Sequence, residues 1–152
     1  MRKYLFYITC SLILPLQVHS HRLDVSGLTC EYRTDPLGVD AKTPRLSWAL
    51  VSNARDVVQA AYRVIVASDP ERLEENEGDV WDSRKQFSDS SLQVRYEGAP
   101  LASAEGCYWK VMVWDNKGDS AWSRPASWQM GLLKPEDWKG ASWIGYEKLE
   151  DS

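Results

Sequence analysis

Carboxylates are the most numerous side chains in this sequence that could do chemistry, since its 152 residues include 22 Asp and Glu. Hydrolysis by a paired acid and base needs only two of them, provided that an apolar environment raises the pKa of the acid. One group forms a solvated acidic run, 71–79, and others fall among turn residues: Asp35, Asp40, Asp89 and Asp119. Neither setting supplies an apolar pocket, so the acids predict no catalytic residue in this chain.

Histidines and cysteines are too few for the other common catalytic centres. The second of two histidines, His21, lies where no neighbouring element would fix its imidazole. A Ser-His-Asp or Cys-His arrangement is therefore excluded, and no Cys/His spacing that binds zinc is present. Asp115, Asn116 and Asp119 could supply oxygen ligands to calcium, but the same residue types build an ordinary hairpin turn. The sequence thus predicts no cofactor and no metal.

Eight tryptophans offer a different chemistry, because an exposed indole ring can stack on the face of a sugar. Trp48 and Trp109 fall on predicted core faces, and Trp138 and Trp143 lie in the C-terminal tail. The candidate sugar-stacking residues are the remaining four: Trp81, Trp114, Trp122 and Trp128.

The first twenty residues have the pattern of an export signal. Met1 to Lys3 is positively charged, 4–16 is mostly apolar, and Val18 and Ser20 are the small residues before a cleavage point. This pattern predicts a signal peptide that is cleaved after Ser20 and a periplasmic or secreted protein. A membrane anchor is the alternative, but the apolar run is too short to span a bilayer.

Net charge limits the possible partners of the protein, and cysteine content limits its possible disulfides. The net charge is −4, and loss of Arg2 and Lys3 with the signal peptide would make it −6. Because the basic residues are dispersed, nucleic acid is excluded as a partner. Cys30 and Cys107 could form one disulfide in an exported chain, or they could be two buried thiols on different strands. The ordinary strand pattern around each of them favours thiols.

The elements that must position these side chains are short β-strands. From residue 26 onward, β-rich runs alternate with turn residues, and Pro70 opens one helical turn that continues to Leu73. Seven short runs with breakers between them are typical of an all-β sandwich. The predicted strands are 28–32, 45–50, 62–67, 80–83, 91–96, 107–115 and 122–130.

The clearest predicted hairpin joins the last two of these strands. Its turn, 115–119, contains an Asn and a Gly that tolerate a positive φ. Because side chains alternate between the two faces of a strand, Trp109, Val111 and Val113 share one face. We expect that face to lie in the core.

Several longer segments resemble a known family. "LTCEYRTDPLGVDAKTPRLSW", "AYRVIVASDPERL", "DVWDSRKQFSDSSLQVRYEGAPL", "CYWKVMVWDNKGDSAWSRPASWQMGLL" and "DWKGASWIG" occur in this order. The order and the motifs Pro-Leu-Gly, Pro-Arg-Leu-Ser-Trp, Trp-Asp-Asn and Trp-Ile-Gly resemble the N-terminal region of bacterial α-L-rhamnosidases of glycoside hydrolase family 78.

This resemblance implies a fibronectin type III or immunoglobulin-like β-sandwich over residues 24–133, followed by a linker and the start of a next domain over 134–152. It also implies a non-catalytic accessory domain, because the acids that hydrolyse terminal α-L-rhamnosides lie in a barrel with no counterpart here. Its partners would be the neighbouring domains of the parent enzyme. A carbohydrate-binding module that recognises rhamnose-containing glycans and a cell-surface adhesion module are the alternatives, since fold does not fix function.

One local feature departs from the usual fibronectin type III pattern, and another extends the resemblance beyond this domain. Fibronectin type III domains usually carry a tyrosine six residues after a leucine, but six residues after Leu101 is Cys107, and Tyr108 comes one residue late. Either the tyrosine corner is lost or the loop 102–106 shifts the register. Near the C-terminus, 138–145 resembles the first strand of a further domain, so we expect the chain to be a truncated piece of a longer protein.

Overall fold

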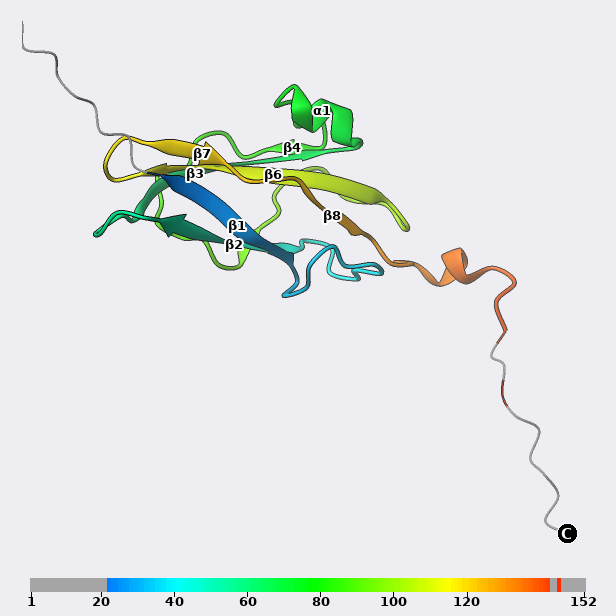
Figure 1. The fold of residues 1–152 in the computed structure, drawn as a ribbon. Helices are drawn as coiled ribbons and strands as arrows, with labels where there is room; N and C mark the ends of the chain where they lie inside the picture. Colours follow the sequence, from blue (N-terminus) through cyan, green and yellow to red (C-terminus); the bar gives the residue numbers. More distant parts are fainter. Residues whose placement is uncertain (1–21, 143–144, 146–152) are drawn as a thin grey trace, which may run out of the picture.

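Two antiparallel β-sheets lie face to face in the computed structural model, which describes residues 22–142 and 145 (Figure 1). The smaller sheet has the strand order β1-β2-β5. Its strands are β1 (Leu23–Cys30), β2 (Arg45–Ser52) and β5 (Val94–Arg95). This arrangement, with the larger sheet above the smaller one in Figure 1, is the immunoglobulin-like sandwich that the sequence predicts.

The larger sheet has the order β4-β3-β6-β7, and β8 also pairs with β6. Its long central strands are β3 (Gln59–Ala67) and β6 (Gly106–Asp115), flanked by β4 (Trp81–Asp82), β7 (Ser120–Trp122) and β8 (Ala126–Gln129). The hairpin between β6 and β7 turns at 115–119, as predicted.

The last predicted strand, 122–130, is in fact two strands. Trp122 pairs with Met112 in β6, whereas Ala126 pairs with Trp109, so the edge strand gains one residue between β7 and β8. Such a bulge reverses the face on which every later side chain lies. Pro125 sits in the gap, where its missing N–H costs the sheet no hydrogen bond.

Other strand ends also differ from the sequence prediction. The first strand runs from Leu23 to Cys30 instead of 28–32, because Glu31 and Tyr32 adopt the left-handed conformation with φ of 47° and 65°. Cys30 and Arg33 close this turn with reciprocal backbone hydrogen bonds of 2.9 and 3.0 Å. The predicted strand 91–96 shrinks to two residues, because Gln93 also has a positive φ.

The core lies between the two sheets and contains residues from both. Trp109, Val111 and Val113 of β6 are fully buried there, which confirms the predicted core face, and Trp48 of β2 is buried opposite them. A smaller apolar cluster lies on the outer face of the larger sheet. It is covered by helix α1 (Pro70–Glu74), whose Leu73 packs on Ile65 and Ala67. Asp69 caps the helix by accepting a hydrogen bond from the Arg72 N–H.

The tyrosine corner is lost, as one of the two sequence alternatives expected. Cys107 faces the core, while Tyr108, paired with Ala67 and Ser127, lies on the outer face beside the smaller cluster. A different tyrosine closes a loop nearby. The hydroxyl of buried Tyr96 donates to the Ala99 carbonyl oxygen at 2.7 Å.

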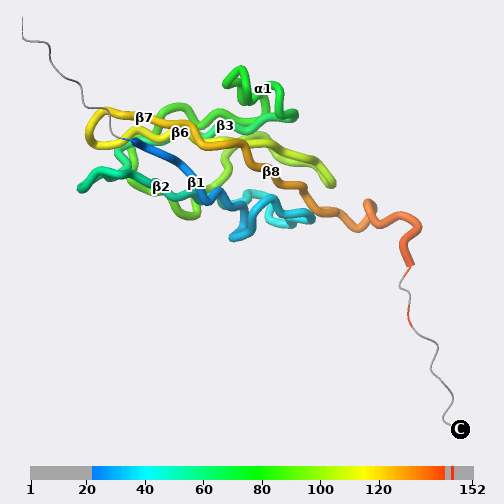
Figure 2. The backbone as a smooth tube through the Cα atoms, viewed as in Figure 1, coloured from blue at the N-terminus to red at the C-terminus, as the bar shows by residue number. Residues whose placement is uncertain are grey.

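The C-terminal segment leaves the end of β8 beside the loop 31–41, and both views show these segments side by side (Figures 1 and 2). Beyond it, Pro135–Trp138 forms a 3-10 turn. The strand predicted over 138–145 is therefore wrong where the structure describes it, because Trp138 ends this 3-10 turn, Lys139 and Gly140 form a turn, and Ala141 and Ser142 are not in a strand. Residues 143–144 of that prediction fall outside the described residues, as does the predicted signal peptide. Within the described part of the chain, no helix has the length and apolar character needed to cross a membrane.

Candidate functional site

Trp128, one of the four candidate sugar-stacking residues, is part of the core. Only 2% of it is exposed, and its ring makes edge-to-face contacts with Tyr96 and Trp109. The expectation of a surface ring is wrong for this residue. The cause is the bulge between β7 and β8, which turns Trp128 inward toward Cys107 and leaves Trp122 outward.

Trp114 and Trp122 lie on the outer face of the larger sheet, but a lysine covers each ring. The Lys85 ammonium is 4.2 Å from the centre of the Trp114 ring, and that of Lys110 is 4.7 Å from the centre of the Trp122 ring. Lys110 is only 8% exposed, and burial lowers its pKa. These cation–π contacts stabilise the two rings in place. A sugar that stacked on the lysine side would have to displace a lysine.

Trp81 is the candidate that lies at a cavity. Its ring packs edge-to-face on Tyr96, with centroids 5.3 Å apart, and is partly exposed. The cavity has a volume of about 560 Å³ and lies between β4 and β5. It is lined mostly by polar groups, which include Tyr62, Asp82, Gln86, Gln93, Arg95 and Glu97.

The segment 83–93, which crosses from the larger sheet to the smaller one, forms much of the cavity wall. Gln59 holds this segment: its amide nitrogen donates to the carbonyl oxygens of Ser88 and Ser90 at 3.0 and 2.8 Å. The amide oxygen of Gln59 accepts a hydrogen bond of 2.9 Å from the Trp48 indole nitrogen in the core. One buried amide thus ties the crossing segment to the core.

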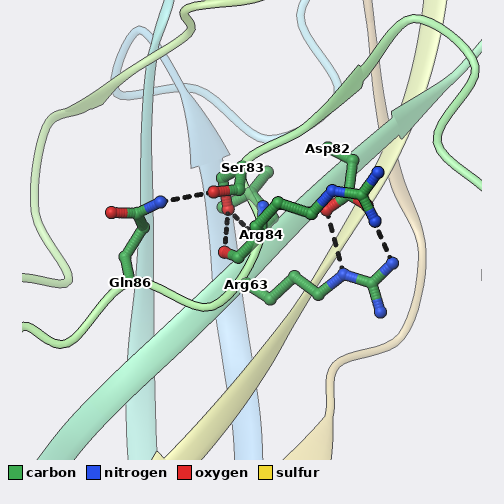
Figure 3. A network of polar contacts seen from close by, with 6 residues as sticks. Arg63, Asp82, Ser83, Arg84 and Gln86 are labelled. Atoms are coloured by element: carbon green, nitrogen blue, oxygen red, sulfur yellow. Dashed lines mark hydrogen bonds and ion pairs between the residues drawn. The ribbon is translucent and has the colours of Figure 1, made fainter.

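A polar network fixes the wall at Asp82 (Figure 3). The Arg63 guanidinium donates two hydrogen bonds of 2.9 Å to the Asp82 carboxylate, and Arg84 forms an ion pair with it at 3.1 Å. The hydrogen bond from Arg63 is the main reason why the pKa of Asp82 lies below its ordinary value. In Figure 3 the Gln86 amide also reaches the Ser83 carbonyl oxygen.

These groups suit the binding of a polar ligand better than acid/base chemistry. Asp82 is a weak base and a poor proton donor, because its low pKa keeps it ionised. Tyr62 carries a hydroxyl with no hydrogen-bond partner among the described residues, and burial raises its pKa. The cavity can therefore offer hydroxyl, amide and charged groups to a ligand beside one aromatic ring.

The remaining candidates for chemistry have structural roles. Cys30 and Cys107 are free and buried, and burial raises the pKa of each thiol to about 12. Asp115 closes the hairpin turn by accepting hydrogen bonds from the N–H groups of Lys117 and Asp119 at 2.8 and 2.9 Å. Among the described residues, no three His, Cys, Asp or Glu side chains are grouped so that they could hold a metal ion.

Sequence reasoning missed most of the cavity. It singled out Trp81 but not Tyr62, Asp82 or the crossing segment. A weak signal was present in the run "SRKQFSDSSLQ", which is rich in Ser and Gln and lacks strand periodicity.

Comparisons with known proteins give one consistent result. A family model described as the Rha78A-like, N-terminal immunoglobulin domain matches residues 25–134. An α-L-rhamnosidase of Streptomyces avermitilis is 45% identical over 123 residues, which are 80% of this chain and 12% of that protein. One from Formosa agariphila is 38% identical over 123 residues, or 80% of this chain and 13% of that protein.

Solved structures agree with the sequence comparisons. The α-L-rhamnosidase from Dictyoglumus thermophilum matches with a TM-score of 0.73 and 39% identity over 76% of this chain and 13% of that one. The Streptomyces avermitilis α-L-rhamnosidase complexed with L-rhamnose matches with a TM-score of 0.73 and 43% identity over 78% of this chain and 11% of that one. The chain thus spans about an eighth of the length of these relatives.

Proposed function

Since the chain belongs to the family of Rha78A-like N-terminal immunoglobulin domains, we propose that it is a non-catalytic accessory domain of an α-L-rhamnosidase. The parent enzyme would hydrolyse terminal α-L-rhamnosides, and this domain would pack beside its neighbours and support the part that does the chemistry. One observation carries the proposal. The match covers almost the whole sandwich, yet it spans only 12–13% of the relatives, which are named for that activity.

The side chains of the domain support the non-catalytic part of the proposal. Two arginines hold the carboxylate of Asp82, and its pKa is lowered. Both thiols are buried with pKa values raised to about 12, so neither is a nucleophile at neutral pH.

The proposal is tested with the isolated chain and a full-length chimera. In the chimera, this chain replaces the matched 123 residues of the Streptomyces avermitilis enzyme. We expect the 152-residue chain to release no product from an aryl α-L-rhamnoside above a heat-treated control, and the chimera to be active. Turnover by the isolated chain would contradict the non-catalytic role, and an inactive chimera would contradict the accessory role.

Carbohydrate binding is a second candidate function, and the position of Trp81 at the wall of a polar cavity favours it. An aromatic ring beside hydroxyl and amide groups suits the two faces of a sugar, one apolar and one polar. L-rhamnose is the probe, because the parent enzyme would act on rhamnosides.

Titration with L-rhamnose, followed by tryptophan fluorescence, tests carbohydrate binding. We expect L-rhamnose to change the emission of the native chain but not that of Trp81→Phe, which keeps a ring against Tyr96. Trp114→Phe is the matched control, because that ring lies on the outer face under Lys85, and it should keep the response. Absence of any response in the native chain would eliminate this candidate and leave the accessory role untouched.

A further inference from the structure

We propose that the end of the sandwich from which the chain leaves is the docking face for the next domain of the parent enzyme. This exit face consists of the loop 31–41, the turn 102–105 and the connector 131–138. The inference rests on the proposed function and adds to it which surface meets the neighbouring domain and how that surface is built.

Exposed apolar side chains gather in these segments. Leu37 is 76% exposed, Tyr32 66%, Trp138 59% and Leu132 39%, which is half of the large hydrophobic residues exposed in the described part of the chain. A single exposed leucine needs no explanation, but several in adjoining segments are typical of an interaction surface. The remaining four are divided between the two ends of the β2–β3 connection and the crossing segment 83–93: Val51, Val58, Phe87 and Leu92.

Leu37 is held in its exposed position by the backbone on both sides. The N–H of Val39 donates to the Gln129 carbonyl oxygen at 2.9 Å, and the N–H of Gly131 donates back to the Val39 carbonyl oxygen at 2.7 Å. On the other side of Leu37, the Pro36 carbonyl oxygen accepts from the N–H of Gln129 at 2.9 Å. A loop fixed in this way presents its leucine with little loss of backbone entropy when a partner binds.

The turn at Leu37 also depends on a glycine. Gly38 has a φ of 74°, a conformation that side chains with a Cβ rarely adopt. Pro36 before Leu37 is buried, and Val39 after Gly38 is buried in the core. The chain thus dips into the protein on both sides of Leu37 and leaves that one apolar side chain outside.

The connector is fixed to the same end of the molecule. The hydroxyl of Ser103 accepts a hydrogen bond from the Leu133 N–H at 2.9 Å and bonds to the Asp137 carboxylate. That carboxylate also accepts from the Lys134 N–H at 3.1 Å. A linker that let two domains move freely would need no such anchor. The anchor instead sets the direction in which the following chain departs, beside the loop 31–41.

The direction of the connector indicates which partner covers the exit face. The relatives are about eight times as long as this match, and the connector leads directly from the exit face toward the rest of such an enzyme. A partner joined by a short anchored connector has a high effective concentration at the face that the connector leaves. An apolar surface on the next domain would cover Leu37, Leu132 and Trp138 together.

The experiment compares two exposed apolar residues in the chimera defined above. Leu37→Asp places a charge on the exit face, whereas Val58→Asp places one before β3, where the valine is 57% exposed and lines neither the exit face nor the cavity. We expect L37D to lower the thermal midpoint of the chimera by several degrees and to speed protease cleavage in the connector at least fivefold. V58D should behave like the parent chimera, because its charge stays in water.

The outcomes separate this inference from the proposed function. In the isolated 152-residue chain, both variants should unfold with the native midpoint, and a loss of stability there with L37D would overturn its assignment as a docking residue. An active chimera in which L37D and V58D behave alike would overturn the docking face alone. A chimera without rhamnosidase activity before any substitution counts against the proposed function.

Discussion

At the scale of the residue, Cys30 and Cys107 show how burial decides chemistry. The sequence left open a disulfide or two thiols, and the structure has two free thiols in one core. Burial disfavours the thiolate, which is the reactive form, and the pKa of each thiol rises to about 12. The pKa of the Tyr96 hydroxyl in the same core also rises to about 12, mainly through burial.

This shift predicts how stability depends on alkaline pH. The unfolded thiols ionise near pH 9 and the unfolded tyrosine near pH 10, whereas the folded groups keep their protons to about pH 12. Stability from these groups is therefore complete below pH 9 and falls as the pH rises toward 12. We expect the urea midpoint to decrease from pH 8.5 to pH 11. The lowered pKa of Lys110 acts in the opposite direction and reduces the slope.

Chemical labelling of the two core cysteines tests directly whether their thiols are buried and protonated. A thiol reagent such as iodoacetamide should leave Cys30 and Cys107 unmodified in the folded protein at pH 8 and should modify both of these thiols in urea. Cys30→Ala combined with Cys107→Ala is the control, and it should reduce the alkaline loss of stability, with the part that comes from Tyr96 remaining. Rapid labelling of Cys30 or Cys107 in the native protein would contradict the buried, protonated state.

At the scale of the element, two serines complete the larger sheet where its edge strands stop. The Ser83 hydroxyl accepts a hydrogen bond of 2.9 Å from the Val64 N–H, and the Ser123 hydroxyl accepts one of 3.1 Å from the Val111 N–H. Each serine N–H donates to the carbonyl oxygen of the same valine. Because Val64 and Val111 are paired in neighbouring strands, the two serines lie on one row at opposite edges.

Replacement of either serine should weaken the sheet. Ser123→Ala leaves the buried N–H of Val111 without its acceptor, which costs about 1–3 kcal/mol of unfolding free energy. Ser83→Ala should cost less, since Ser83 is more exposed. Urea unfolding measures the free-energy cost of both substitutions. Ser120→Ala, on the same edge but exposed and with a side chain outside these hydrogen bonds, should stay within about 0.5 kcal/mol of the native chain. A neutral Ser123→Ala would refute this role.

At the scale of the whole molecule, both sheets share one core. Leu46 and Trp48 of the smaller sheet and Val64, Val111 and Trp109 of the larger one belong to a single buried cluster. Elements that bury the same apolar surface lose it together, so a domain of this size is expected to unfold in one cooperative step.

Shortening a core side chain in the smaller sheet tests whether the two sheets unfold together. Leu46 is fully buried, so Leu46→Ala should lower the unfolding free energy by about 2–5 kcal/mol. Tryptophan fluorescence, which mainly reports on the larger sheet, and circular dichroism should give the same shifted midpoint. Val58→Ala, at an exposed site, is the control and should change little. Two separate transitions would show that the sheets unfold independently.

Local pattern was enough to predict the features that depend on neighbours in sequence. Alternation along 107–115 placed Trp109, Val111 and Val113 in the core, and the residues of 115–119 predicted the hairpin turn. Asp69 and Pro70 likewise marked the short helix. These features follow from backbone geometry over a few residues, which composition and spacing reveal.

Features that join distant segments were decided only by the tertiary structure. Trp122 and Trp128 are six residues apart and would share a face in an unbroken strand, but one inserted residue places them on opposite faces. The cavity is another such feature, because Tyr62, Trp81 and the aperiodic segment 83–93 meet only after Gln59 ties that segment to the core. The sequence alone determined the sandwich and its family. The register of the edge strand, the state of the thiols and the exposure of Leu37 depend on long-range packing, which no local pattern encodes.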